Sequence, residues 1–159
     1  MADRIGIMHQ GKLVQVGTPA EIYEAPRTRW VAEFIGEVNL FDGVVVGSRA
    51  GVANVETPAG RLSVQTDALH TGGKVSVAVR PEKVAIAREQ PNDAVNALQG
   101  SIADIAYLGD LSVYKVRLPS GMLMKASVAN TDRRAAGLLR RGEEAWLSFS
   151  PDAGVLIRE

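Results

Sequence analysis

Residues 114–128 read YKVRLPSGMLMKASV, and this stretch decides the fold class. Apolar residues alternate with polar or less apolar residues on both sides of Pro119-Ser120-Gly121. Alternation with a period of two is typical of β-strands that bury one face. Proline and glycine in a short connection favour a tight turn. We therefore expect a β-hairpin here.

The same pattern continues outward from this hairpin. Val75, Val77 and Val79 alternate with smaller or charged residues. Further strands are expected around residues 42–46, 52–57, 100–107 and 143–149. Many short strands separated by glycine and proline predict a small barrel or sandwich, so the expected fold class is mainly β. The one later stretch expected to hold a helical turn is 131–141.

The strand-rich region contains a faint internal repeat. Residues 41–44 and 98–102 each open a strand that carries a glycine, and Val79-Arg80-Pro81 and Phe149-Ser150-Pro151 each close one with a proline. We expect two related halves whose strands interleave in one barrel.

The first 36 residues follow a different pattern, which predicts a short α+β segment. Two apolar runs, at residues 4–8 and 12–16, flank a His9-Gln10-Gly11 turn and predict a hairpin. Thr18-Pro19-Ala20-Glu21 predicts a capped helix start, and a helix should end before Pro26. A second short helix is expected from Thr28 to Ile35.

The second helix gathers large apolar residues on one side. Trp30, Val31, Phe34 and Ile35 recur at helical spacing and form a candidate dimer or packing face. Because an exposed apolar face attracts a partner, we expect a homodimer.

Composition excludes several classes of function. The chain has 18 basic and 18 acidic residues, no cysteine and two histidines. Disulfides and cysteine-ligated zinc are therefore excluded, and no metal site is expected. The neutral charge and the low aromatic content argue against a nucleic-acid partner. No signal peptide or membrane-spanning run is apparent, so a cytoplasmic protein is expected.

No catalytic constellation is found. Gly6 to Lys12 has the spacing of a phosphate-binding loop, but Leu13 stands where that motif needs a serine or threonine. No serine lies in a G-x-S-x-G nucleophile elbow. We expect neither catalytic residues nor an ATP site in this chain.

Residues 2–23, ADRIGIMHQGKLVQVGTPAEIY, closely resemble the end of the nucleotide-binding domain of ABC importer ATPases. Residues 26–36 resemble the helix that links that domain to a C-terminal regulatory domain. Residues 79–83 resemble the Arg-Pro-Glu signature of TOBE (transport-associated OB) domains, and residues 107–110 resemble their Tyr-Leu-Gly element. The resemblance implies a nucleotide-binding tail at 1–36 and an OB-like TOBE barrel at 37–159.

The resemblance also implies a function, and it is nearest to importers of spermidine and putrescine. The chain is then a C-terminal fragment that braces an ATPase dimer and does not hydrolyse ATP alone. ATP and magnesium would bind to the full-length parent, whose partners are the ATPase core and the transmembrane permease subunits. The parent would be peripheral on the cytoplasmic face of the inner membrane.

A regulatory solute site is a further expectation, with Arg80, Glu82, Tyr107 and Asp110 as candidate positions. An alternative function stays open, namely an OB module that binds a small ligand or an oxyanion. Arg80, Lys83 and Ser127 would contribute to an oxyanion site.

Overall fold

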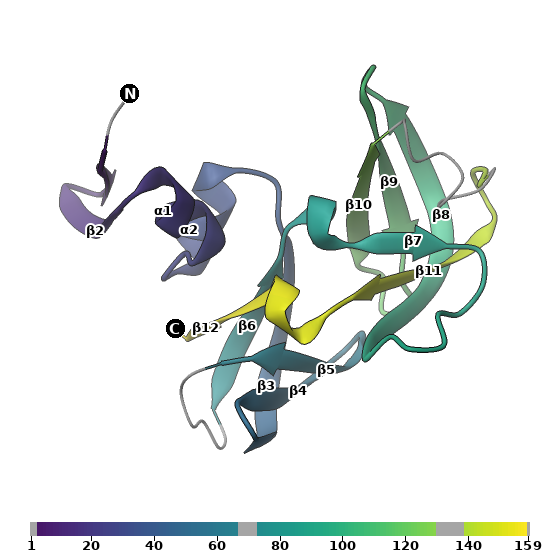
Figure 1. The fold of residues 1–159 in the computed structure, drawn as a ribbon, viewed down its shortest axis with the longest axis horizontal. Helices are drawn as coiled ribbons and strands as arrows, with labels where there is room; N and C mark the ends of the chain where they lie inside the picture. The colour runs from purple at the N-terminus through teal and green to yellow at the C-terminus, as the bar shows by residue number, and fades with distance from the viewer. Residues whose placement is uncertain (1–2, 67–72, 130–138, 159) are drawn as a thin grey trace.

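The computed structural model describes residues 3–66, 73–129 and 139–158 (Figure 1). An N-terminal segment contains β1 (Ile5–His9), β2 (Lys12–Gly17), α1 (Pro19–Glu24) and α2 (Arg29–Ile35). The first half of the strand-rich region contains β3 (Asn39–Arg49), β4 (Val52–Thr57), β5 (Gly60–Gln65), β6 (Lys74–Val79), the 3₁₀ turn η1 (Pro81–Lys83) and β7 (Ala85–Ala87). The second half contains β8 (Asn96–Tyr107), β9 (Leu111–Arg117), β10 (Leu123–Ala129), β11 (Glu144–Phe149), η3 (Pro151–Ala153) and β12 (Gly154–Arg158).

The mainly β expectation is confirmed, and so is the hairpin from which it came. β9 and β10 pair in antiparallel register, with Lys115 opposite Lys125. The Gly121 amide donates to the Leu118 carbonyl, and Gly121 has a φ of 94°, a left-handed conformation that favours glycine. Most of the stretch expected to form a helical turn, 131–141, lies outside the described residues.

The two halves interleave by exchanging their last strands. One five-stranded sheet has the order β12-β6-β3-β4-β5, and the other has the order β10-β9-β8-β11-β7. Each sheet therefore takes one edge strand from the other half of the chain. Figure 1 shows β12 beside β6 and β7 beside β11. The faint repeat in the sequence therefore corresponds to two barrel halves that complete each other.

The glycine in each strand opening permits a close approach to the neighbouring strand of the same sheet. A Cβ atom at Gly43 would lie 2.4 Å from the Glu56 carbonyl oxygen, and one at Gly100 would lie 2.5 Å from that of Arg117. Only glycine fits at such distances. A bulge follows in both long strands, after Val45 in β3 and after Ile102 in β8. Bulges bend a strand, and here they curl each sheet.

One hydrophobic core spans both halves. It contains, among others, Val55, Leu62 and Val77 from the first half and Ile102, Met124 and Leu147 from the second. The rings of Phe41 and Phe149 lie 6.4 Å apart across the boundary. Since the two halves bury their apolar side chains against each other, they form one structural unit.

The N-terminal segment has a small core of its own. Ile7, Ile22 and Val31 are buried together, on the inner side of the β1–β2 hairpin. Thr18 Oγ1 accepts a hydrogen bond from the Glu21 amide at 3.2 Å, as its capping pattern predicts. The hairpin turn and both short helices are thus confirmed where the sequence predicts them.

Candidate functional site

Arg80 fastens the N-terminal segment to the barrel. Its side chain is 6% exposed, and its Nη1 donates to the carbonyl oxygens of Ala32, Gly36 and Glu37 at 3.0–3.1 Å. Nη2 donates to the Tyr23 carbonyl at 3.4 Å, and the guanidinium lies 4.4 Å from the centre of the Tyr23 ring. The last carbonyls of a helix lack partners within the helix, and a guanidinium can satisfy several of them at once. Arg80 therefore acts as a clamp on the end of α2.

The next residues of the turn hold α1. The Tyr23 hydroxyl donates to a carboxylate oxygen of Glu82, and Lys83 Nζ lies 2.6 Å from Glu24 Oε2. Burial raises the pKa of Tyr23 to about 12, with the hydrogen bond to Glu82 and the negative charge of Glu82 as the next causes. We call Arg80, Glu82 and Lys83 the clamp turn, because each contacts the N-terminal segment.

Two ion pairs also join the region of α2 to strands of the barrel. Arg29 at the start of α2 forms an ion pair with Asp42 of β3, and Ser76 Oγ donates to the same carboxylate at 2.8 Å. Glu37, just after α2, pairs with Lys125 of β10, and this hydrogen bond lowers the pKa of Glu37. The junction between the segment and the barrel therefore combines these polar contacts with a small apolar cluster, in which Ala32 of α2 is buried with Ala78 of β6 and Ile157 of β12.

A groove of about 550 Å³ opens beside the clamp turn. Its lining residues come from η1, β7, the start of β9 and the end of β10: Glu82, Lys83, Val84, Ala85, Ile86, Asp110, Leu111, Ser127, Val128 and Ala129. Strands β7 and β10 are the two edges of the second sheet. The groove thus lies at the seam where that sheet does not close on itself.

The structure separates the four candidate solute positions. Glu82 and Asp110 line the groove, together with Lys83 and Ser127. The Arg80 guanidinium donates its hydrogen bonds to carbonyls of the N-terminal segment. Tyr107 is 70% exposed and does not line the groove. Solute binding at these positions stays a prediction.

Sequence reasoning did not single out Tyr23 and Glu24. Both are bonded to the clamp turn more than fifty residues away in the chain, at Glu82 and Lys83. No local pattern signals a partner at that separation, because the fold alone brings the two stretches together.

The apolar face of α2 is divided between the small core and the surface. Val31 is fully buried, and Trp30 and Ile35 pack at the margin of the small core. Phe34 is 61% exposed and stacks on Trp30, with ring centres 4.9 Å apart. The His9 ring also contacts Trp30, with its centre 4.0 Å from that of the Trp30 ring. Three of the four residues thus pack within the segment, and Phe34 remains available at its surface.

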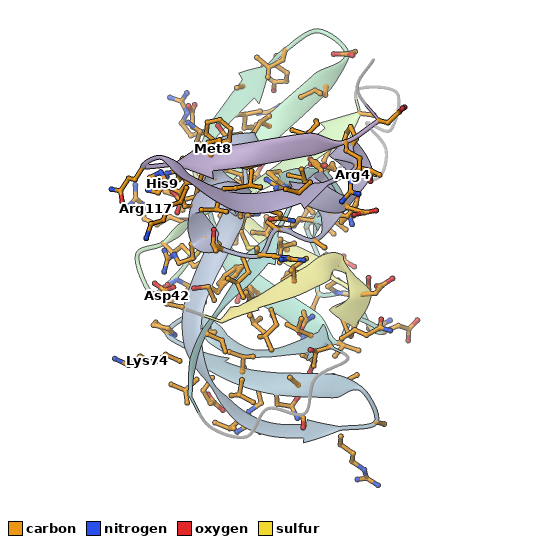
Figure 2. The ribbon with its side chains drawn as sticks, turned by 90° about the vertical axis from the view of Figure 1, so that its left-hand side faces the viewer. Arg4, Met8, His9, Asp42, Lys74 and Arg117 are labelled. Carbon is orange, nitrogen blue, oxygen red and sulfur yellow. The ribbon has the colours of Figure 1, made fainter. Side chains whose placement is uncertain are left out.

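The outer side of the β1–β2 hairpin is also apolar. Met8 and Leu13 are opposite each other in the register and are 56% and 59% exposed. Val16 is 38% exposed on the same strand as Leu13. Figure 2 faces this hairpin, with Arg4 toward one end and His9 toward the other. Apolar residues on both faces of a two-stranded sheet are typical of a sheet that packs against other parts of a protein on each face.

Membrane-spanning helices and metal clusters are both absent from the described residues. None of the described helices is long and apolar enough to cross a membrane. Within the same residues, no three His, Cys, Asp or Glu side chains come together in a way that would hold a metal ion.

Two curated relatives align with nearly the whole chain. The putrescine transport ATP-binding protein PotG of Escherichia coli (strain K12) is 44% identical, over 99% of this chain and 42% of the relative. The spermidine/putrescine import ATP-binding protein PotA of Frankia alni (strain DSM 45986 / CECT 9034 / ACN14a) is 35% identical, over 100% of this chain and 36% of the relative. The chain therefore spans about two-fifths of the length of these relatives.

A solved structure shares the fold. The cytoplasmic molybdate-binding protein ModG, crystallised with molybdate bound, superposes with a TM-score of 0.67 over 76% of this chain and 96% of that chain. The sequence identity is 18%, so the likeness concerns the fold alone. It confirms the expected OB-like barrel. Residues 77–157, half of the chain, match the family described as the TOBE domain, and the chain belongs to that family.

Proposed function

We propose that this chain is the regulatory and dimerisation domain of the ATP-binding subunit of an ABC importer for polyamines. The chain itself hydrolyses no ATP, and the longer subunit binds ATP and magnesium through residues outside it. Its partners are the ATPase core and the transmembrane permease, at the cytoplasmic face of the inner membrane. The alignment with polyamine-import relatives over nearly all of this chain and two-fifths of theirs supports the proposal.

The observation that supports a mechanical link between the ATPase body and the barrel is the clamp turn. Residues 1–36, in this proposal, form the tail of the nucleotide-binding domain, and residues 37–159 form the regulatory barrel. The apolar outer side of the hairpin, with Met8 and Leu13 exposed, then packs on the ATPase body. Arg80 bonds the end of α2 to the barrel, so a movement of the ATPase body is passed to the barrel through a buried guanidinium.

Dimerisation is the second part of the proposal. The barrels of two subunits brace each other and keep two ATPase bodies in position for ATP hydrolysis. A dimer of this chain in light scattering at high micromolar concentration supports this part, and a monomer under the same conditions contradicts it.

Uptake of labelled putrescine by cells that carry the full-length subunit and its permease tests the function. Arg80→Ala in that subunit should reduce uptake several-fold at an unchanged protein level, whereas Arg61→Ala, an exposed residue of the barrel, should leave uptake unchanged. Uptake of an unrelated solute in place of polyamines would contradict the substrate class.

A small-ligand module is a second candidate function, and the two carboxylates that line the groove favour it. Calorimetric titration with spermidine, putrescine, molybdate and ATP tests it. Saturable binding of a polyamine that Asp110→Asn weakens would identify a sensor of imported solute. Binding of molybdate would favour an oxyanion module instead.

A further inference from the structure

We propose that helix α2 of one copy of the chain packs on the outer face of the second sheet of another copy, with Phe34 against Trp146. In a two-fold symmetric dimer this contact occurs twice. The inference rests on the proposed dimerisation and names the surfaces that form the contact.

The register of the strands makes the two halves of the barrel equivalent residue by residue. Asn39 lies opposite Val79 in the first sheet, as Asn96 lies opposite Phe149 in the second. Counting from these pairs, the residues on the outer face of the first sheet are Leu40, Ser76, Ala78, Val155 and Ile157. In the same order, the equivalent residues of the second sheet are Ala97, Trp146, Ser148, Ala85 and Ala87. We call these two sets the first and the second outer face.

Helix α2 covers the first outer face of its own barrel. Ala32 of α2 is fully buried and packs with Ala78 and Ile157, which are 3% and 2% exposed. On the second outer face Ala85 is exposed, and the other four residues are half-buried. Figure 1 shows both α-helices near β3 and β6, away from β7 and β11. The second outer face is thus the equivalent of a helix-binding face, and no helix of the described residues covers it.

The other side of α2 is apolar and exposed. Successive residues of an α-helix are rotated by about 100°, so Ala32 and Phe34 point in nearly opposite directions. Phe34 is 61% exposed and stacks on Trp30. The helix can therefore lie between two sheets, with Ala32 on the first outer face of its own barrel and Phe34 on the second outer face of another copy. The alanines around Trp146 leave space for the Phe34 ring beside the indole, where an aromatic pair is favourable.

The contact should be weaker than the docking of α2 on its own barrel. The register places Ser150 in the second half where Arg80 stands in the first, and the Ser150 hydroxyl bonds to Asp152. A helix on the second outer face therefore lacks the guanidinium that bonds the end of α2 in the first half. Apolar packing alone predicts a dimer that dissociates on dilution.

Cysteine pairs test the contact directly, because the chain contains no cysteine. Chains with Phe34→Cys are mixed with chains that carry Ala87→Cys and a different tag, and a short bismaleimide joins thiols that lie close together. This pair should crosslink at least about tenfold faster than Tyr107→Cys with Ala87→Cys. Tyr107 is the matched control, since it is 70% exposed and belongs to neither outer face.

Light scattering over a dilution series gives a second measurement. Phe34→Ala should raise the dissociation constant of the dimer about tenfold, and Tyr107→Ala should leave it unchanged. A dimer in which both cysteine pairs crosslink equally, or in which Phe34→Ala has no effect, overturns this inference and leaves the proposed dimerisation in place. A chain that stays monomeric at high micromolar concentration overturns both.

Discussion

Asn39 and Asn96 occupy equivalent positions in the two halves of the barrel, and each bonds to the other half. Both are the first residue of a long, bulged strand, and both are buried. Asn39 pairs with the backbone of Lys125, and Asn96 pairs with the backbone of Ser63, where the amide donates to Asn96 Oδ1 at 2.7 Å and the carbonyl accepts from Nδ2 at 2.8 Å. Two side-chain amides therefore join the halves in the same way.

Removal of either amide should destabilise the whole barrel. Asn39→Ala and Asn96→Ala each lose two buried hydrogen bonds and leave backbone groups unpaired, which should cost about 2 kcal/mol in the free energy of unfolding. Urea unfolding followed by circular dichroism measures this cost. The control Asn92→Ala is exposed and should change stability by less than about 0.5 kcal/mol. Equal stability of all three variants would refute the role given to the buried amides.

The glycine of β3 that lies close to β4, Gly43, should not tolerate a methyl group. A Cβ at Gly43 would meet the Glu56 carbonyl oxygen, so Gly43→Ala should cost about 3 kcal/mol. Gly47 lies in the same strand and has no positive φ, and a Cβ there would meet no atom within 4 Å, so Gly47→Ala is the matched control. Thermal unfolding should separate the two variants by many degrees, and similar melting temperatures would contradict the close approach of β3 to β4.

The Arg80 clamp should control the N-terminal segment more than the barrel. Arg80→Lys keeps the charge but loses the second nitrogen, which bonds the Tyr23 carbonyl, and the planar guanidinium that lies over the Tyr23 ring. Amide exchange in α1 and α2 should therefore accelerate about tenfold or more, with exchange in β9 unchanged. Hydrogen-exchange mass spectrometry resolves these regions. Uniform acceleration throughout the chain would indicate a global loss of stability and no specific clamp.

The Tyr23 phenol should ionise at a higher pH than an ordinary tyrosine. Its pKa of about 12 in the folded chain exceeds its ordinary value of 10.0. The stabilisation by the protonated phenol is therefore complete below pH 10 and is lost as the pH rises through about 12. Carbon-13 NMR of labelled tyrosine, assigned with Tyr23→Phe, follows this ionisation. Glu82→Gln should bring the pKa of Tyr23 closer to its ordinary value, and an unchanged pKa would contradict the hydrogen bond.

The Glu37–Lys125 pair should make the stability of the chain depend on pH in the acidic range. The hydrogen bond and the charge of Lys125 lower the pKa of Glu37 below its ordinary value of 4.5. The resulting stabilisation is present above pH 4.5 and is lost as the pH falls through the lower, folded-state pKa. In Lys125→Met the Glu37 carboxyl should titrate close to its ordinary value, as measured by NMR. Because the pair is exposed, the effect on overall stability should be small.

Local patterns were sufficient for the fold class and for most of the secondary structure, but the strands β5, β7 and β12 were not among those expected. The period-two alternation of residues 114–128 predicted the β9–β10 hairpin, and Thr18 predicted the start of α1. The repeated glycines and prolines also indicated two interleaved halves. The exchange of β7 and β12 could not be predicted in detail, since strand order depends on contacts far apart in the chain.

The candidate site was predictable only in part, for the same reason. Glu82 and Asp110 were singled out and do share a groove. Arg80 was also singled out, but its role on the end of α2 follows from how the segment docks on the barrel. Tyr107 comes from the same short element as Asp110, yet a turn separates their positions and leaves Tyr107 exposed.

The exchange of last strands has a consequence for synthesis on the ribosome. The sheet that contains β3 stays incomplete until β12 is made, and β12 (residues 154–158) is translated after every other strand of the barrel. The other sheet contains β7, which is made early and must remain without its partner β11 until residues 144–149 emerge. Neither half can finish folding as it leaves the exit tunnel, so the barrel closes in one late, cooperative step.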